Sequence, residues 1–388
     1  MRVSFALLAC LLALAAGCTD REELAVSVTP ETGLVDEPFD VRVTGAAPGE
    51  SVRITVATES EGGAAWSLTR EARADDAGGV VLPDEYLLAN LRPGRDAPED
   101  DYLLPPFSLE VTVGAGDEEA ATSVRRFVRS DSVKVSELQI DDVGFRGRWW
   151  VPTEDARRTA ILLLGGSEGG IAGDLLLASV LAGRGYPVLA LAYFGLPGLP
   201  SELARIPLEY FRTALEWLRR QEGVDPDRIV AFGGSRGGEL ALILGSTYRD
   251  LVDAVVGYVP NSNVFPAIPD VDQPAWTLRG EPLESTLIPV ERIDGPVFVV
   301  GGGDDQLWPS GTSVDFIGRQ LELSGHRDFV ALSYPKAGHS VGLAVPNIQT
   351  STSAETRYGR LYFGGTPEAD EAAREDSWPK LLRFLDEL

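Results

Sequence analysis

Residues 24–135 alternate hydrophobic and polar side chains in short segments that turn residues separate. FDVRVTG (39–45), VRITVAT (52–58) and FSLEVTV (107–113) each repeat with a period of two, the period of a strand with one buried face. No stretch of this region has the spacing of an amphipathic helix. The pattern predicts an antiparallel β-sandwich of roughly 100 residues.

Residues 136–388 replace this alternation with continuous apolar runs and amphipathic segments. TAILLLGG (159–166), DRIVAFGG (227–234) and GPVFVVGGG (295–303) are apolar runs that end in glycine, as is typical of strands buried on both faces of a sheet. LEYFRTALEWLRRQ (208–221) has hydrophobic residues at helical spacing. We therefore expect an α/β domain with a mostly parallel sheet and helices on both faces.

The start of the chain has the pattern of an export signal. An apolar run from Val3 to Ala16 follows Arg2 and is shorter than the roughly 20 residues of a membrane-spanning helix. Small residues directly precede Cys18, as at the cleavage site of a bacterial lipoprotein. This predicts a signal peptide over 1–17 and an exported protein anchored to the membrane by lipid on Cys18. An ordinary signal peptide cleaved nearby is the alternative.

Composition excludes several classes of protein. Hydrophobic residues make up 44% of the chain and charged residues 24%, which excludes a disordered or polytopic membrane protein. The net charge of −25 disfavours nucleic acid and other polyanions as partners. Both cysteines, Cys10 and Cys18, lie near the start, and there are two histidines, so we expect no disulfide, no metal and no cofactor. The acidic tract PEADEAARED (367–376) is interpreted as a solvated helix face without a partner.

The segment GGSRG (233–237) places a G-x-S-x-G motif between a predicted strand and a predicted helix. In that context the glycines permit a tight turn that presents a serine nucleophile in strained backbone geometry. The same turn directs the amide of Arg236 toward the place where an oxyanion would form. The motif therefore predicts Ser235 as the nucleophile of a hydrolase.

A serine nucleophile needs a base, and only two histidines are available. His339 directly follows a predicted strand, where such sheets place catalytic loops, whereas His326 lies in a polar stretch typical of the surface. Asp304 and Asp305 follow another strand between Ser235 and His339. The order Ser, Asp, His is that of α/β-hydrolases. We favour Asp305 as the acid that orients the imidazole, with Asp304 capping the turn.

A second glycine-rich segment, GGSEGG (165–170), follows the first strong buried strand. We expect a backbone amide of Ser167 or Glu168 to complete the oxyanion hole, and a plain strand-to-helix loop is the alternative. Glu168 and Arg236 form either a solvated ion pair or a substrate contact, and both interpretations stay open. Trp308, beside the acid loop, is interpreted first as a packing residue and second as part of an acyl pocket.

Several long segments resemble those of one known family, the acyl-CoA thioesterase and bile acid-CoA:amino acid N-acyltransferase family. The segments in the hydrolase part are AFGGSRGGELAL, GGGDDQLWPS, YPKAGH and GGTPEADEAAREDSWPKLLRFL. The region before them resembles the immunoglobulin-like domain of that family, so the resemblance covers nearly all of the chain after the leader. It implies cleavage of an acyl thioester through an acyl-enzyme, with Ser235 as nucleophile, His339 as base and Asp305 as orienting acid.

Two features separate this chain from members of that family. Ser235 stands where the amidating members have cysteine, which favours hydrolysis over transfer to an amine. The export signal separates the protein from intracellular acyl-CoA. Alternatives are therefore an exported carboxylesterase, an acyl-CoA:amine N-acyltransferase, and a surface-binding lipoprotein whose hydrolase domain is inert. The oligomeric state, the acyl chain length and the leaving group are not predicted.

Overall fold

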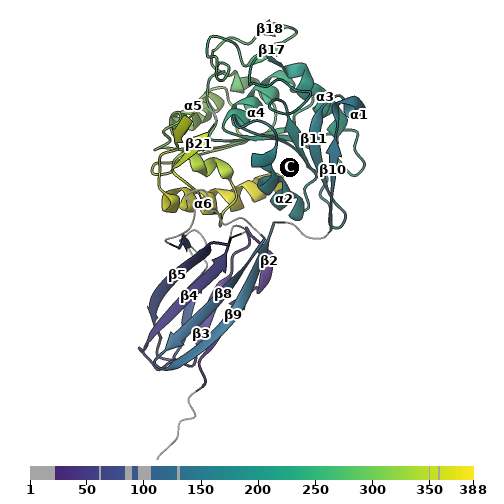
Figure 1. Ribbon diagram of the computed structural model, residues 1–388. Coiled ribbons are helices and arrows are strands. Elements are labelled where there is room, and N and C mark those ends of the chain that lie inside the picture. The colour runs from purple at the N-terminus through teal and green to yellow at the C-terminus, as the bar shows by residue number, and fades with distance from the viewer. Residues whose placement is uncertain are drawn as a thin grey trace, which may run out of the picture.

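The computed structural model describes residues 22–60, 63–83, 90–94, 106–128, 132–348, 350–356 and 359–388. It contains a β-sandwich and a larger α/β domain, joined near residue 132 (Figure 1). The predicted leader and Cys18 lie outside the described residues. Across the described ranges, no helix has the length and apolar character needed to cross a membrane.

The N-terminal body is a sandwich of two sheets. The smaller sheet contains, in spatial order, β1 (Ala25–Thr29), β3 (Asp40–Thr44) and β6 (Val80–Pro83). The larger sheet contains β2 (Thr32–Leu34), β9 (Glu118–Phe127), β8 (Phe107–Ala115), β4 (Ser51–Glu59), β5 (Ala65–Arg73) and β7 (Arg92–Pro93). Along β8, Phe107, Leu109 and Val111 are buried and the residues between them are more exposed, as a period of two requires. The predicted β-sandwich is confirmed.

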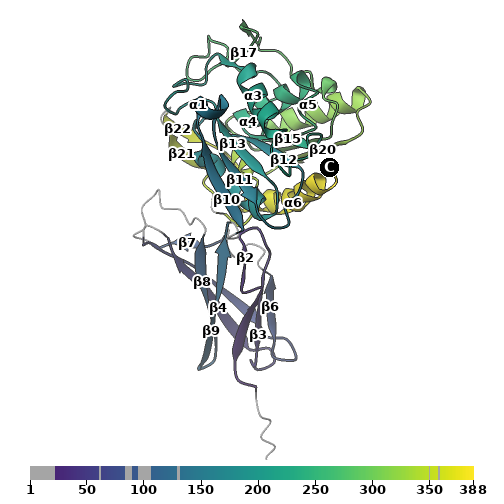
Figure 2. The same cartoon turned by 90° about the vertical axis from the view of Figure 1, so that its right-hand side faces the viewer.

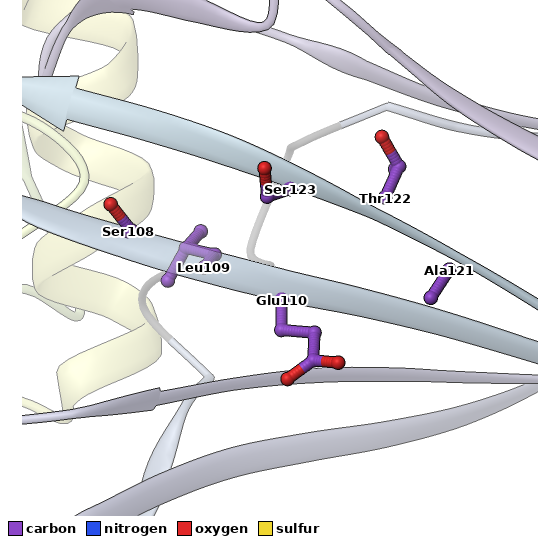
Figure 3. Close-up of a pocket in the computed structure, with 6 residues that line it drawn as sticks. All are labelled: Ser108, Leu109, Glu110, Ala121, Thr122 and Ser123. Carbon is purple, nitrogen blue, oxygen red and sulfur yellow. The ribbon is translucent and has the colours of Figure 1, made fainter.

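Strands β8 and β9 border a hollow of about 400 Å³, shown in Figure 3. Its lining residues are Ser108, Leu109, Glu110, Ala121, Thr122 and Ser123. They include hydroxyl groups but no histidine or lysine, so they supply no base of the kind that usually activates a serine. The site predicted from the sequence lies in the other domain.

The α/β domain is built on one eight-stranded sheet. Its spatial order is β10 (Val133–Leu138), β11 (Arg146–Pro152), β13 (Val188–Ala192), β12 (Ala160–Leu164), β15 (Ile229–Gly234), β16 (Ala254–Tyr258), β19 (Val297–Gly302) and β20 (Phe329–Tyr334). The pairs from β13 to β20 are parallel, and β10 and β11 form an antiparallel edge. Every residue of β12, β13 and β16 is buried. The mostly parallel sheet predicted from the apolar runs is confirmed.

Helices cover both faces of this sheet. One face packs against α2 (Leu175–Gly183) and α6 (Pro367–Asp386). The other packs against α3 (Leu208–Leu218), α4 (Arg236–Thr247) and α5 (Ser310–Leu323). Figure 1 and Figure 2 both show α6 on the side of the domain nearest the sandwich.

Shorter elements complete the domain. The helical ones are α1 (Ile140–Val143), η1 (Ala172–Asp174), η2 (Val290–Arg292) and η3 (His339–Leu343). The short strands are β14 (Ile206–Pro207), β17 (Trp276–Leu278), β18 (Glu281–Pro282), β21 (Ser353–Thr356) and β22 (Gly359–Tyr362). The division expected between residues 135 and 136 falls inside β10, because that strand pairs with β11 from Val133 to Leu138.

Candidate active site

Ser235 lies at a sharp turn between the end of β15 and the start of α4. Its backbone is strained, with φ at 56° and ψ at −121°, a conformation that costs a non-glycine residue roughly 1–3 kcal/mol. A β-carbon at Gly233 would lie 2.1 Å from the carbonyl group of Gly237, and one at Gly237 would lie 1.9 Å from the carbonyl oxygen of Leu164. The glycines are therefore required by close backbone contacts, as the motif predicts.

The structure brings Ser235, His339 and Asp305 into one hydrogen-bonded chain. Oγ of Ser235 lies 3.1 Å from Nε2 of His339, and Nδ1 of His339 lies 2.8 Å from Oδ2 of Asp305. The side chain of Asp305 is fully buried, and that of His339 is 11% exposed. The three residues follow β15, β20 and β19, so the carboxyl ends of three parallel strands hold them at one edge of the sheet.

The acid loop holds the carboxylate of Asp305 from several directions. Oδ1 accepts the backbone N–H groups of Leu307, at 3.0 Å, and Trp308, at 3.4 Å. Oδ2 also accepts the hydroxyl of Ser310 at 2.6 Å. Asp304 instead accepts the N–H of Gly365 at 3.0 Å. The structure therefore places Asp305 at the imidazole and leaves Asp304 to brace the turn.

Ser310 is a site residue that the sequence analysis missed. It is the first residue of α5 and is fully buried. Its hydroxyl donates to Asp305 and also lies 3.1 Å from the amide nitrogen of Gly302, from which it accepts. A serine at a helix start five positions after the acid was the available signal, because a hydroxyl there lies within reach of the preceding loop.

Aromatic rings surround the imidazole of His339. Trp308 meets it edge to face, with ring centroids 5.0 Å apart, and the ring of Phe363 lies 6.1 Å away at an interplanar angle of 28°. Nε1 of Trp308 donates to the carbonyl oxygen of Val259 at 3.1 Å. Trp308 therefore packs against the base itself. His326 lies just after the end of α5, where its amide donates to the carbonyl oxygen of Leu321, and it does not join the site.

The glycine-rich loop after β12 passes next to the nucleophile. A β-carbon at Gly166 would lie 3.3 Å from Cβ of Ser235. The N–H of Gly166 donates to Oε1 of Glu168 at 3.0 Å, so this amide already has an acceptor. The backbone amides of Ser167 and Glu168 have no hydrogen-bond partner within the described residues. Arg236 is the first residue of α4, so its N–H has no acceptor inside the helix.

The side chain of Arg236 points into the protein rather than toward Glu168. It is fully buried and pairs with the buried carboxylate of Glu239 at 3.3 Å, and its Nη2 donates to the carbonyl oxygen of Phe265 at 3.0 Å. Both interpretations of Arg236 made from the sequence are therefore wrong for its side chain, because no solvent or substrate reaches it. Its predicted contribution rests on its backbone amide alone.

Glu168 is exposed and lies beside a second carboxyl group. Oε1 of Glu168 and Oδ2 of Asp174 would both lie within 3.1 Å of a β-carbon at Gly165. Burial raises the pKa of Asp174 well above its ordinary value, and the charge of Glu168 raises it further. Both effects disfavour the charged form of the Asp174 carboxyl.

The acidic tract over 367–376 is not the solvated helix face expected from its composition. Asp370, Glu371 and Arg374 on α6 are each 0% exposed. Asp370 accepts the N–H of Gly338, the residue directly before His339, at 2.6 Å. The expectation is wrong because this part of α6 packs on the loop that carries the histidine, where backbone groups supply the hydrogen bonds that water would otherwise make.

The domain has a mostly parallel sheet with a serine at a strained turn after one strand, and an acid and a histidine follow two other strands. This arrangement, with the chain order Ser, Asp, His, defines the α/β-hydrolase class. The profile described as BAAT / Acyl-CoA thioester hydrolase C terminal matches residues 206–273 and 270–388. The profile therefore covers the C-terminal part of the chain, and relatives that are named acyl-CoA thioesterases or bile acid-CoA:amino acid N-acyltransferase are similar to it over nearly its whole length. The resemblance drawn from the sequence, and the class of thioesterase-like hydrolase, are confirmed.

Two relatives from mouse illustrate the extent of this similarity. The chain is 29% identical to mitochondrial acyl-coenzyme A thioesterase 2 of Mus musculus over 410 residues, which covers 94% of this chain and 89% of that protein. It is 25% identical to bile acid-CoA:amino acid N-acyltransferase of Mus musculus over 410 residues, which covers 93% and 96%. Among solved structures, MGS-M1, an α/β-hydrolase from a deep-sea metagenome library, is 19% identical, with a TM-score of 0.46 and coverage of 66% and 98%.

Proposed function

We propose that this protein is a serine hydrolase that cleaves acyl thioesters of the acyl-CoA type through an acyl-enzyme on Ser235. The observation that carries the proposal is the hydrogen-bonded chain from Ser235 through His339 to the buried Asp305. The substrate class follows from relatives that are named acyl-coenzyme A thioesterases over nearly the whole chain.

In the first half of the reaction, Oγ of Ser235 attacks the thioester carbonyl carbon while Nε2 of His339 accepts the hydroxyl proton. Asp305 accepts the N–H at Nδ1, which fixes the imidazole tautomer and stabilises the imidazolium. The amide of Arg236 and that of Ser167 or Glu168 are the proposed donors to the oxyanion. The carbon–sulfur bond then breaks, and the imidazolium returns its proton to the leaving thiolate.

In the second half, water replaces the thiol. His339 removes a proton from the water, whose oxygen attacks the acyl carbon on Ser235, and the same imidazolium then protonates Oγ as the ester bond breaks. The products are a free carboxylic acid and the original enzyme. An amine in place of the water would give an amide instead, which is the transferase alternative.

Export and a lipid anchor on Cys18 form a second part of the proposal, supported by the leader pattern over residues 1–17. The test is incorporation of radiolabelled palmitate by cells that produce the protein, with Cys18→Ala as the matched variant. We expect label in the membrane fraction for the wild type and none for the variant. Equal labelling, or a wild-type protein found without lipid, contradicts this part alone.

The catalytic proposal is tested with purified protein and the Ser235→Ala variant on a medium-chain acyl-CoA and the matching p-nitrophenyl ester. We expect Ser235→Ala to lower kcat/KM for the thioester by about a thousandfold or more. Turnover of the oxygen ester alone would assign the protein to the carboxylesterases. Added glycine or taurine distinguishes transfer, because only a transferase forms the amide. Failure of a fluorophosphonate to label Ser235 would support an inert, surface-binding lipoprotein.

A further inference from the structure

A buried cluster of charged residues on α6 lies directly behind the loop that carries His339. Asp370, Glu371 and Arg374 are all 0% exposed. Nη2 of Arg374 forms an ion pair with Oε2 of Glu371, and Oε1 of Glu371 accepts the amide of Asn347. Buried charges are costly unless they are paired or hydrogen-bonded. Three buried charged residues beside one loop therefore call for a function.

The cluster and the segment before α6 hold three consecutive residues of this loop. Gly338 donates its N–H to Oδ1 of Asp370 at 2.6 Å. His339 donates its own N–H to the carbonyl oxygen of Phe363 at 2.8 Å. The carbonyl oxygen of Ser340 accepts from Nη1 of Arg374 at 3.3 Å. The backbone on both sides of His339 is therefore fixed by hydrogen bonds to α6 and to the segment before it.

The charges of this cluster do not cancel. Arg374 neutralises Glu371, which leaves the carboxyl group of Asp370 without a close cation of its own. Its second oxygen, Oδ2, has no hydrogen-bond partner among the described residues. The charged and titratable groups that act on it are Arg374 on its own helix, Asp305 on the acid loop and His339 on the histidine loop.

These surroundings change the acidity of Asp370. The net effect is to raise the pKa of this carboxyl to about 6. Burial is the largest cause and the charge of Asp305 adds to it, while the Gly338 amide, Arg374 and His339 oppose the increase. Above that pH the group is a buried carboxylate in a region of low dielectric constant, where a charge acts over a longer distance than in water. The nearest group that becomes positive during the proposed reaction is the imidazole of His339.

We propose that Asp370 is a positioning residue for His339, fixing the backbone before it and supplying a second negative charge that stabilises the imidazolium. This inference rests on the proposed function, since it assigns His339 the role of the base. Asp305 acts on the ring directly, whereas Asp370 acts across the loop through Gly338. The expected consequence is that removal of this charge makes His339 easier to deprotonate and a weaker proton acceptor.

The first test measures His339 directly by NMR, which is practical because the chain has only two histidines. Ring signals are titrated in the Ser235→Ala background, and His326→Gln assigns them. We expect Asp370→Asn to lower the midpoint of the His339 titration by roughly 0.5 to 1 pH unit. Asp376→Asn is the matched control, because it removes a half-exposed carboxylate from the same helix and should leave the midpoint unchanged. An unchanged midpoint in Asp370→Asn overturns the inference.

The second test uses active enzyme. In Asp370→Asn the acid limb of the pH profile of kcat/KM should move to lower pH by the same amount, with kcat reduced about three- to tenfold. An acid limb and a kcat equal to those of the wild type would overturn the inference. Absence of any Ser235-dependent hydrolysis in the wild type contradicts the proposed function instead, and the NMR titration still tests the coupling.

A folding defect in Asp370→Asn is covered by a second pair of variants. Asp370→Glu keeps the charge and Asp370→Gln has the same length without it, so the two variants share any packing defect. The inference requires a higher His339 midpoint in the Glu variant than in the Gln variant. Equal midpoints overturn it.

Discussion

The carboxylate of Asp36, in the sandwich, accepts the indole N–H of Trp378, on the last helix of the α/β domain, at 2.8 Å. The same oxygen accepts Nε of Arg184 at 2.9 Å, and the side chain of Asp36 is fully buried. Asn347 adds a second link between the domains, because its side-chain nitrogen Nδ2 donates to the carbonyl oxygen of Val35 at 3.1 Å. The sandwich is thereby attached to the helix that also supports the histidine loop.

Replacing Asp36 by alanine should weaken this attachment. Burial raises the pKa of Asp36, and Arg184 and Trp378 oppose the increase. The alanine variant leaves the N–H groups of Arg184 and Trp378 without this acceptor, and the loss of stability comes from these two donors. We expect the free energy of unfolding in urea to fall by about 2 kcal/mol. Asp40→Ala removes an exposed acid from the same sandwich and serves as control. Equal unfolding midpoints for the two variants would show that the contact contributes nothing.

A methyl group at Gly237 should disrupt the turn of the nucleophile. The added β-carbon would lie 1.9 Å from the carbonyl oxygen of Leu164, so the backbone has to shift. We expect Gly237→Ala to lower kcat/KM at least a hundredfold and to destabilise the protein by about 3 kcal/mol. Gly114→Ala is the control, because its nearest contact lies at 3.9 Å. Full activity of Gly237→Ala would contradict the described turn.

Ser310→Ala should reduce activity without abolishing it. The variant removes the hydroxyl that Asp305 accepts at 2.6 Å, while the bond from His339 to Asp305 remains. We expect kcat to fall about tenfold, since a hydrogen bond to a charged group contributes roughly 1.5–3 kcal/mol and part of it is replaced. Ser313→Ala, on the same helix and also buried, should retain wild-type kcat. A wild-type rate for Ser310→Ala would mean that the backbone amides alone hold Asp305.

The buried carboxyl of Asp370 should make stability depend on pH. Its pKa is about 6 in the folded protein against an ordinary 3.8, so the folded state binds this proton more tightly than the unfolded state. The contribution of the group to the free energy of unfolding therefore falls as the pH rises from about 4 to about 6, by up to roughly 3 kcal/mol. Asp370→Asn removes this dependence.

The measurement is urea unfolding of the wild type and Asp370→Asn at pH 4.5 and pH 7.5. Relative to the wild type, the variant should be more stable at pH 7.5 than at pH 4.5. Other buried carboxyl groups affect both proteins equally, so they cancel in this double difference. The same difference at both pH values would show that Asp370 titrates as an ordinary surface carboxyl.

The sequence by itself determined the architecture and the nucleophile. Alternation with a period of two predicts the sandwich, because it sorts side chains between core and solvent on each strand. Uninterrupted apolar runs predict the parallel sheet, because both of its faces are covered. The GGSRG segment (233–237) predicts the turn at Ser235, because only glycine fits the close contacts on either side. Each of these patterns is local in the chain.

Only the tertiary structure decided how distant residues combine. Asp304 and Asp305 are neighbours of the same chemistry, and the path of the acid loop alone sends one to Gly365 and the other to His339. The polar composition of α6 indicates a solvated helix, yet its packing on the histidine loop buries Asp370 and Arg374. Composition describes what a side chain prefers on average, whereas burial depends on which backbone groups reach it after folding, and no local pattern contains that information.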